Sequence, residues 1–239
     1  MPTSERVRLG TLDTWVLRPD GWTPADGVCV LLHGFGAPGD DLVALAEYVD
    51  APARMAWAFP AALLELPGIY GEARAWWMID LARFERAAAQ GTLGDLIRDE
   101  PEGLAAARAA VLGMLDAVRT DLGVADDRVV LGGFSQGAML SLDVILRSDR
   151  AFAAAILMSG SHLAADAWAP RLAGRAGLRV LISHGRQDPL LPFPISEGLV
   201  DRLVSAGLDV TWLPFDGAHS IPPQVLAAAG RLLGAALDR

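Results

Sequence analysis

The sequence predicts an α/β fold, a three-layer α/β/α sandwich with a mostly parallel central sheet. Short apolar runs alternate along the chain with longer segments of helical pattern. The runs are apolar nearly throughout, as expected of strands that helices bury on both faces. Such alternation implies parallel strands joined by right-handed crossovers. With 239 residues, we expect a single domain over residues 1–239.

Six strands are predicted in order along the chain, and the stretch Val7–Arg18 is expected to add one or two edge strands. The six strands are Gly27–Leu32, Arg54–Phe59, Arg128–Gly132, Ala154–Met158, Leu178–Ser183 and Asp209–Phe215.

Five helices are predicted between and after these strands. The first starts near Asp40, a plausible N-cap followed by apolar residues at helical spacing. The second is Ala-rich, which favours a helix, and Gly123 is expected to end it. This second helix is expected to begin after Pro101 and to run to about Leu122. The remaining three helices are expected at Ala138–Arg147, Ile195–Ala206 and Pro223–Leu237.

One segment, at about residues 60–94, is longer than an ordinary connection and rich in large apolar side chains. A solvated linker would not carry so many. We therefore expect a loop or lid-like insertion in the domain.

Composition excludes several classes of protein. The formal charge is −9, and all 20 cations are scattered Arg residues, which argues against a nucleic-acid partner. No apolar run approaches the roughly 18 residues of a membrane span. A single cysteine, Cys29, cannot form an internal disulfide, and the N-terminus has no apolar signal region, so we expect a cytoplasmic protein.

The segment Gly133-Phe134-Ser135-Gln136-Gly137 is the one G-x-S-x-G in the chain, and it lies between a predicted strand and a predicted helix. That context is typical of a nucleophile elbow, in which a sharp turn exposes the serine hydroxyl. Ser135 is therefore the candidate nucleophile, and a serine needs a base to take its proton.

The order along the chain in this architecture is serine, acid, histidine. His219 follows the last predicted strand and is the candidate base; His184 and His162 are the alternatives. Asp188 follows another strand and is the candidate acid. The alternative acids are Asp166, Asp201, Asp209, Asp216 and Glu197.

An oxyanion hole in this architecture uses two backbone N–H groups. Gln136, directly after the candidate nucleophile, supplies the first. The strand Gly27–Leu32 ends in His33-Gly34-Phe35-Gly36, which makes Phe35 the candidate for the second. His33 itself is expected to be structural.

With these motifs, the sequence resembles the phospholipase/carboxylesterase group of the α/β-hydrolase superfamily, which includes acyl-protein thioesterases. The resemblance rests on four motifs in the family's order: residues 33–36, 133–137, His184-Gly185-Arg186-Gln187-Asp188 with Leu191-Pro192, and the turn 217–219. It implies a nucleophile at Ser135, an acid at Asp188 and a base at His219. The chain departs from the family at Ala138 and Ala218, where glycine is usual, and in the segments 37–41 and 60–94.

The function that this implies is a serine hydrolase of carboxylic esters, or thioesters, with short- to medium-chain acyl groups. Trp77 and Met78 are interpreted as walls of an acyl groove opposite Leu191. The alternative is that these two side chains belong to the core under a long loop. A peptidase or amidase with the same triad, or a silent ligand-binding fold, are the other functions considered. No metal or cofactor is expected, the partner is a small-molecule ester, and a homodimer is left open.

Overall fold

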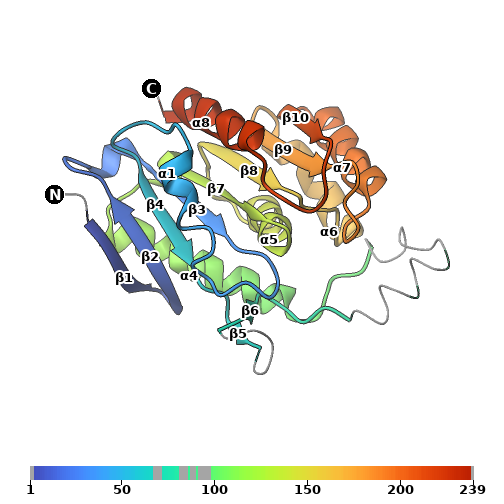
Figure 1. Ribbon diagram of the computed structural model, residues 1–239, viewed down its shortest axis with the longest axis horizontal. Coiled ribbons are helices and arrows are strands. Elements are labelled where there is room, and N and C mark those ends of the chain that lie inside the picture. The colour runs from blue at the N-terminus through green and yellow to red at the C-terminus, as the bar shows by residue number, and fades with distance from the viewer. Residues whose placement is uncertain (1–2, 67–71, 81–85, 87–89, 91–97, 238–239) are drawn as a thin grey trace.

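The computed structural model describes residues 3–66, 72–80, 86, 90 and 98–237. Its centre is an eight-stranded sheet in the order β1-β2-β4-β3-β7-β8-β9-β10 (Figure 1). β1 pairs antiparallel with β2, and β2 with β4, while all the other pairs are parallel, so the predicted mostly parallel sheet is confirmed. The strands are β1 (Thr3–Leu9), β2 (Leu12–Arg18), β3 (Val28–Leu32), β4 (Ala56–Pro60), β7 (Val129–Phe134), β8 (Ala154–Met158), β9 (Arg179–Gly185) and β10 (Asp209–Phe215).

Helices cover both faces of this sheet. The cores on the two faces are separate clusters, and α4, α5 and α7 pack on one face while α8 packs on the other (Figure 1). The helices are α1 (Leu45–Tyr48), α4 (Leu104–Asp121), α5 (Gln136–Leu146), α6 (Ala165–Trp168), α7 (Phe193–Ser205) and α8 (Pro223–Leu237). Short 3-10 helices lie at Pro24–Asp26, Asp126–Arg128 and Ala169–Arg175.

β3 shows why the buried strands are apolar throughout. Val28, Val30 and Leu32 belong to the core cluster on one face, and Cys29 and Leu31 to the cluster on the other. Successive side chains of a strand point to opposite faces, so a strand between two helical layers needs apolar residues at every position.

The helix expected from Asp40 is the main error in the predicted elements. α1 spans only Leu45–Tyr48, and the preceding residues form turns. Their amide groups donate to the carbonyl three residues back, as Val43 does to Asp40 at 3.1 Å. The apolar spacing was that of a helix, but the hydrogen bonds close the tighter 3-10 ring.

The predicted insertion at residues 60–94 lies partly outside the described residues, which exclude 67–71, 81–85, 87–89 and 91–94. Its described part contains a two-stranded sheet that the sequence did not indicate, formed by β5 (Leu64–Glu65) and β6 (Arg74–Ala75). Trp76 and Trp77, which follow β6, are almost fully buried.

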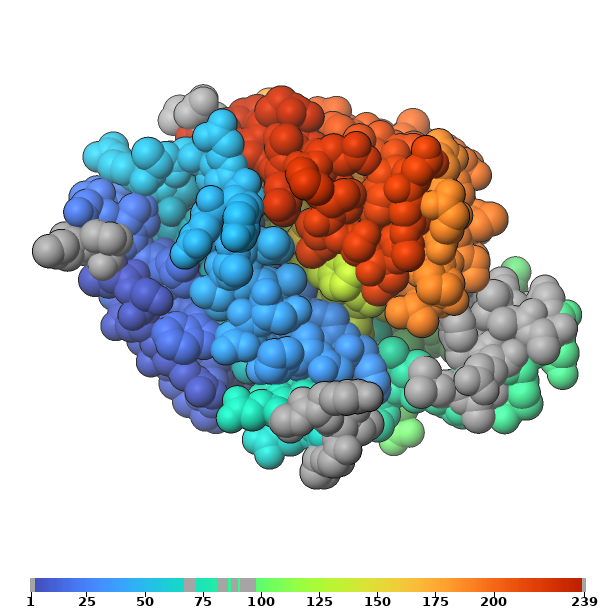
Figure 2. All heavy atoms as spheres, viewed as in Figure 1, coloured from blue at the N-terminus to red at the C-terminus, as the bar shows by residue number. Residues whose placement is uncertain are grey.

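The carboxyl ends of β3, β7, β8, β9 and β10 lie at one edge of the sheet, because these strands are parallel. Binding sites in open α/β sheets form at this edge. Figure 2 shows a hollow between the blue segment of the chain and the orange-red C-terminal elements, with yellow-green atoms of the β7–α5 region at its bottom.

In the described part of the chain, no helix combines the length and apolarity needed to cross a membrane.

Candidate active site

Ser135 occupies a strained turn between β7 and α5. Its φ is 55° and its ψ is −119°, a backbone conformation that non-glycine residues rarely adopt. The turn lies so close to β3 that a Cβ atom on Gly133 or Gly137 would come within 2.4 Å or 2.0 Å of the Leu32 carbonyl oxygen. The two glycines of the motif are therefore required by this close approach, and the turn has the backbone geometry of the predicted elbow.

Asp188 and His219 are joined by a short hydrogen bond. Nδ1 of His219 donates to Oδ2 of Asp188 at 2.6 Å, while the backbone N–H groups of Leu190 and Leu191 donate to Oδ1 at 2.9 and 3.0 Å. Burial alone would raise the pKa of Asp188, but the hydrogen bonds from His219, Leu191 and Leu190 outweigh it and lower that pKa. The carboxylate is therefore ionised at neutral pH and can orient and stabilise an imidazolium.

Close packing between two loops positions this pair. Gln187 donates its backbone N–H to Gly217 at 3.0 Å, and a Cβ atom on Gly185 would lie 2.2 Å from the Ala218 carbonyl oxygen. The loop after β9, which carries Asp188, is thus fixed against the turn that carries His219.

His219 also contacts the elbow. Its ring centroid lies 4.7 Å from that of Phe134, the residue directly before Ser135. Ser135 and His219 both line one cavity at the carboxyl edge of the sheet. The three side chains proposed from the sequence are therefore brought to one place.

The alternative acids and bases lie elsewhere or contact other groups. Within the described ranges, none of the alternative acids hydrogen-bonds to His219; Asp216 faces Arg186 and Asp209 faces Arg179. His184 is fully buried behind Asp188, and His162 lines the cavity.

The loop after β3 brings the second oxyanion candidate beside the serine. A Cβ atom on Gly34 would lie 3.3 Å from the Ser135 Cβ, and Phe35 lines the same cavity as Ser135. Gln136 is the first residue of α5, where backbone N–H groups have no helical acceptor. Both candidate donors are thus near the serine.

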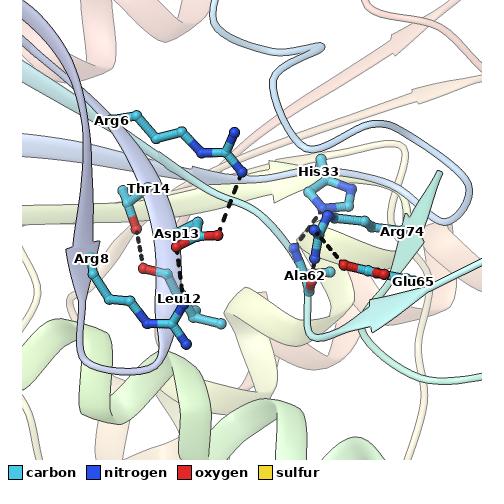
Figure 3. A network of polar contacts seen from close by, with 9 residues as sticks. All are labelled: Arg6, Arg8, Leu12, Asp13, Thr14, His33, Ala62, Glu65 and Arg74. Atoms are coloured by element: carbon cyan, nitrogen blue, oxygen red, sulfur yellow. Dashed lines mark hydrogen bonds and ion pairs between the residues drawn. The ribbon is translucent and has the colours of Figure 1, made fainter. Parts of the chain in front are cut away.

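His33 holds this loop in shape. Its Nδ1–H donates to the Gly34 carbonyl at 2.7 Å, and its Nε2 accepts the Ala62 backbone N–H at 2.9 Å (Figure 3). Burial lowers the pKa of His33 to about 4, so the ring is neutral at physiological pH. The Trp76 indole donates to the His33 carbonyl at 2.9 Å, which fixes the backbone from the other side.

The side chain of Gln136 has a role that the sequence did not indicate. It is fully buried, its Oε1 accepts the Trp76 backbone N–H at 2.9 Å, and its Nε2 donates to the Trp77 carbonyl at 2.9 Å. The first residue after the elbow therefore anchors the segment that follows β6.

The cavity beside Ser135 has a volume of about 380 Å³ and a mostly apolar lining. Trp77 and Leu191 line it, as the groove interpretation expected. Met78 does not: its side chain is 59% exposed and lies outside the lining, and Ile79 takes its place. Trp77 and Ile79 line the cavity, while Met78 between them is exposed to solvent.

Three polar residues of the lining were not singled out as ligand contacts from the sequence: Asp41, Ser161 and His162. They lie on loops after β3 and β8 that no motif marks as part of a cavity. In the described residues, no group of three His, Cys, Asp or Glu side chains could hold a metal ion.

Comparison with known proteins places the chain in a family. The profile of the phospholipase/carboxylesterase family matches residues 20–235. An acyl-protein thioesterase 1 of Schizosaccharomyces pombe is 27% identical over 206 residues, which cover 83% of this chain and 86% of that protein. The acyl-protein thioesterase 1 of Gibberella zeae is 31% identical over 142 residues, and the match spans 57% of this chain and 60% of that protein.

Solved structures agree with this assignment. The crystal structure of esterase PE8 superposes with a TM-score of 0.78 at 27% identity and covers 94% of this chain and 98% of that one. The Bacillus cereus carboxylesterase, at 20% identity, has a TM-score of 0.71 over 94% of each chain and shows the same fold. Because the family profile spans nearly the whole chain, the protein belongs to the phospholipase/carboxylesterase family of α/β-hydrolases.

Proposed function

We propose that the protein hydrolyses carboxylic ester or thioester bonds of short- to medium-chain acyl substrates, through an acyl-enzyme formed on Ser135. The observation that carries the proposal is the convergence of Ser135 and the Asp188–His219 pair at one cavity. Those side chains come from three loops far apart in the sequence. Such convergence is the geometric signature of nucleophilic catalysis by a serine triad.

The reaction proceeds in two steps. His219 Nε2 takes the proton of the Ser135 hydroxyl as Oγ attacks the substrate carbonyl, and it returns that proton to the leaving alcohol or thiol. Water then loses a proton to His219 and attacks the acyl-enzyme, which releases the acid and restores the Ser135 hydroxyl. Asp188 stabilises the imidazolium in both steps.

The negative oxygen of each tetrahedral intermediate is assigned to the backbone N–H groups of Phe35 and Gln136. Loss of one such donor raises the barrier by about 3–4 kcal/mol in enzymes of this type. The strained turn at Ser135 supports the assignment, because it exposes the hydroxyl beside the N-terminus of α5.

The cavity supports the acyl-length part of the proposal. Its volume of about 380 Å³ falls at the low end of the roughly 300–1,000 Å³ of small-molecule sites. Trp77, Ile79 and Leu191 give it apolar walls suited to a short or medium alkyl chain. The expectations of a cytoplasmic location, a homodimer, and one domain with an insertion at residues 60–94 stay predictions.

The test is hydrolysis of a p-nitrophenyl ester series from acetate to decanoate by the wild type and by Ser135→Ala. We expect wild-type activity to peak at short or medium chains and to fall by at least about 10³-fold in the variant. A fluorophosphonate probe should label only the wild type. Equal rates in the two proteins would overturn the proposal, and a matched anilide and thioester series would separate amidase and thioesterase activity from esterase activity.

A further inference from the structure

His162 is a buried histidine that the proposed reaction does not use. It follows β8 in the segment Ser159-Gly160-Ser161-His162, and it is only 5% exposed. Its ring stacks on Trp168 with centroids 5.4 Å apart and planes at 30°. The Trp168 indole donates a 2.8 Å hydrogen bond to the fully buried Asp143. The ring of His162 therefore stacks on a side chain whose position is fixed.

The imidazole of His162 is neutral. Burial lowers its pKa to about 4, and the charge of Arg202 acts in the same direction. A neutral imidazole has one N–H donor and one nitrogen acceptor, which face away from each other, so a hydroxyl group can pair with either nitrogen.

Within the described residues, neither ring nitrogen of His162 has a hydrogen-bond partner, and nor does the hydroxyl of Ser161, which is also 5% exposed. His33, His184 and His219 each have at least one such partner. The polar atoms of His162 and Ser161 are not fully enclosed by protein, because the fully buried unpaired side-chain atoms in the described residues are Ser183 Oγ and His184 Nδ1. They are therefore open to a ligand without leaving a sealed polar atom uncompensated. Both side chains line the cavity that contains Ser135, so a bound substrate could supply the missing partner.

We propose that His162 and Ser161 form a polar subsite in the substrate cavity, and that it binds a neutral hydroxyl group on the chain of the ester substrate. This inference rests on the proposed esterase function and narrows its substrate class to esters that carry a hydroxyl group away from the scissile bond. The apolar walls at Trp77 and Ile79 accommodate the methylene groups between the two.

The charges of the cavity favour a neutral group over an anion. Among the described lining residues there is one carboxylate, Asp41, and no arginine. The charge of Arg202 acts on His162, but Arg202 does not line the cavity, so a carboxylate there would contact no cation to replace its hydration and would face Asp41. A hydroxyl group loses less on leaving water, and it can pair with one ring nitrogen of His162 in either role and with the Ser161 hydroxyl in the other.

The experiment uses matched esters that differ only at the far end of the chain. Methyl 6-hydroxyhexanoate and methyl heptanoate have chains of equal length that end in a hydroxyl or a methyl group, and monomethyl pimelate carries a carboxylate there. The pair 5-hydroxypentyl acetate and hexyl acetate repeats the comparison on the alcohol side. The measured quantity is the ratio of kcat/KM for the hydroxyl ester to that for its methyl partner.

Three variants test the residues. His162→Phe keeps a flat ring to stack on Trp168 but removes both polar nitrogens, Ser161→Ala removes the hydroxyl, and His162→Gln restores a donor and an acceptor. We expect the hydroxyl-to-methyl ratio to fall about tenfold in His162→Phe, in one or both ester pairs, and to recover in part in His162→Gln. Monomethyl pimelate should be the poorest of the three acyl esters for the wild type.

The ratio is taken within each protein, so a general loss of activity or stability cancels. An unchanged ratio in His162→Phe for both pairs, with the methyl esters still hydrolysed, would overturn the subsite and leave the esterase function standing. If the wild type hydrolysed none of these esters and no p-nitrophenyl ester, the proposed function would fail and the subsite with it.

Discussion

His184 lies beside Asp188, with its Nε2 atom 3.3 Å from the Oδ2 atom that also accepts the hydrogen bond from His219. The same Nε2 is 2.8 Å from the Leu191 carbonyl oxygen, and the ring is fully buried. Burial lowers the pKa of His184, so the ring is neutral and Nε2 carries the donated hydrogen. The Nε2–H group therefore donates to the Leu191 carbonyl, and the ring lies against the Asp188 carboxylate.

We predict that His184→Leu will lower kcat/KM by about tenfold, because the Leu191 carbonyl loses its hydrogen-bond donor and the Asp188 carboxylate loses the ring packed against it. The measurement is kcat/KM for p-nitrophenyl acetate between pH 5 and 9.

His184→Gln is the matched control, because its amide nitrogen can occupy the position of Nε2. It should recover part of the rate. If His184→Leu is folded by its melting curve and keeps the wild-type rate across this pH range, His184 does not position Asp188.

The strained backbone at Ser135 predicts that a glycine at this position stabilises the fold while it removes the activity. Ser135→Gly should abolish hydrolysis and raise the free energy of unfolding by roughly 1 kcal/mol, because glycine adopts φ of 55° without the Cβ strain. Ser135→Ala keeps the Cβ atom and should have nearly wild-type stability. Urea unfolding of the three proteins checks this, and a glycine variant less stable than the alanine variant would contradict it.

The lowered pKa of His33 predicts that the folded protein loses stability in mild acid. Its pKa is about 4 in the folded protein and close to 6.5 in the unfolded chain, so the unfolded state binds more protons between these values. Stability is therefore full above about pH 6.5 and falls as the pH is lowered toward 4. Between pH 7 and pH 5, this one residue should account for a loss of about 2 kcal/mol.

The measurement for His33 is the free energy of urea unfolding at pH 7 and pH 5 in the wild type and in His33→Gln. Glutamine does not titrate, and its side-chain oxygen can accept the Ala62 N–H. The difference between the two pH values should shrink by about 2 kcal/mol in the variant. Because other groups titrate equally in both proteins, an identical pH dependence would refute the assignment.

The sequence predicted the sheet well because its strands are local features. An apolar run such as Ala154–Met158 has one interpretation when helices flank it, and β8 has these bounds. The segment after Asp40 was harder, because apolar spacing does not distinguish an α-helix from consecutive 3-10 turns. Gly36 and Gly39, both with positive φ, fix a loop before it that no periodicity reveals.

The candidate site was predictable where a motif ties residue type to position, as at Ser135 and Asp188. Cavity membership was not, because it depends on which side chains of converging loops face inward. Met78 and Ile79 are adjacent apolar residues, yet one is exposed and the other lines the cavity. His162 carried no signal in the sequence beyond its residue type.

The contacts of the Gln136 side chain predict that this residue controls the shape of the substrate cavity. Gln136→Met has a similar length but leaves the Trp76 N–H and the Trp77 carbonyl unpaired in the interior. We expect the free energy of unfolding to fall by about 2–3 kcal/mol. Activity on p-nitrophenyl hexanoate should fall about tenfold more than activity on the acetate, because only the longer chain reaches the Trp77 wall.

Met78→Ala is the matched control for this prediction, because Met78 lies in the same segment but outside the cavity. Its kcat/KM should stay near the wild-type value for both esters, and its stability should change by less than about 0.5 kcal/mol. The ratio of hexanoate to acetate activity separates a distorted cavity from a general loss of folded enzyme. A Gln136→Met protein that keeps the wild-type ratio would show that the anchored segment does not set acyl-chain preference, whereas a changed ratio in Met78→Ala would show that the exposed face of the segment also contacts substrate.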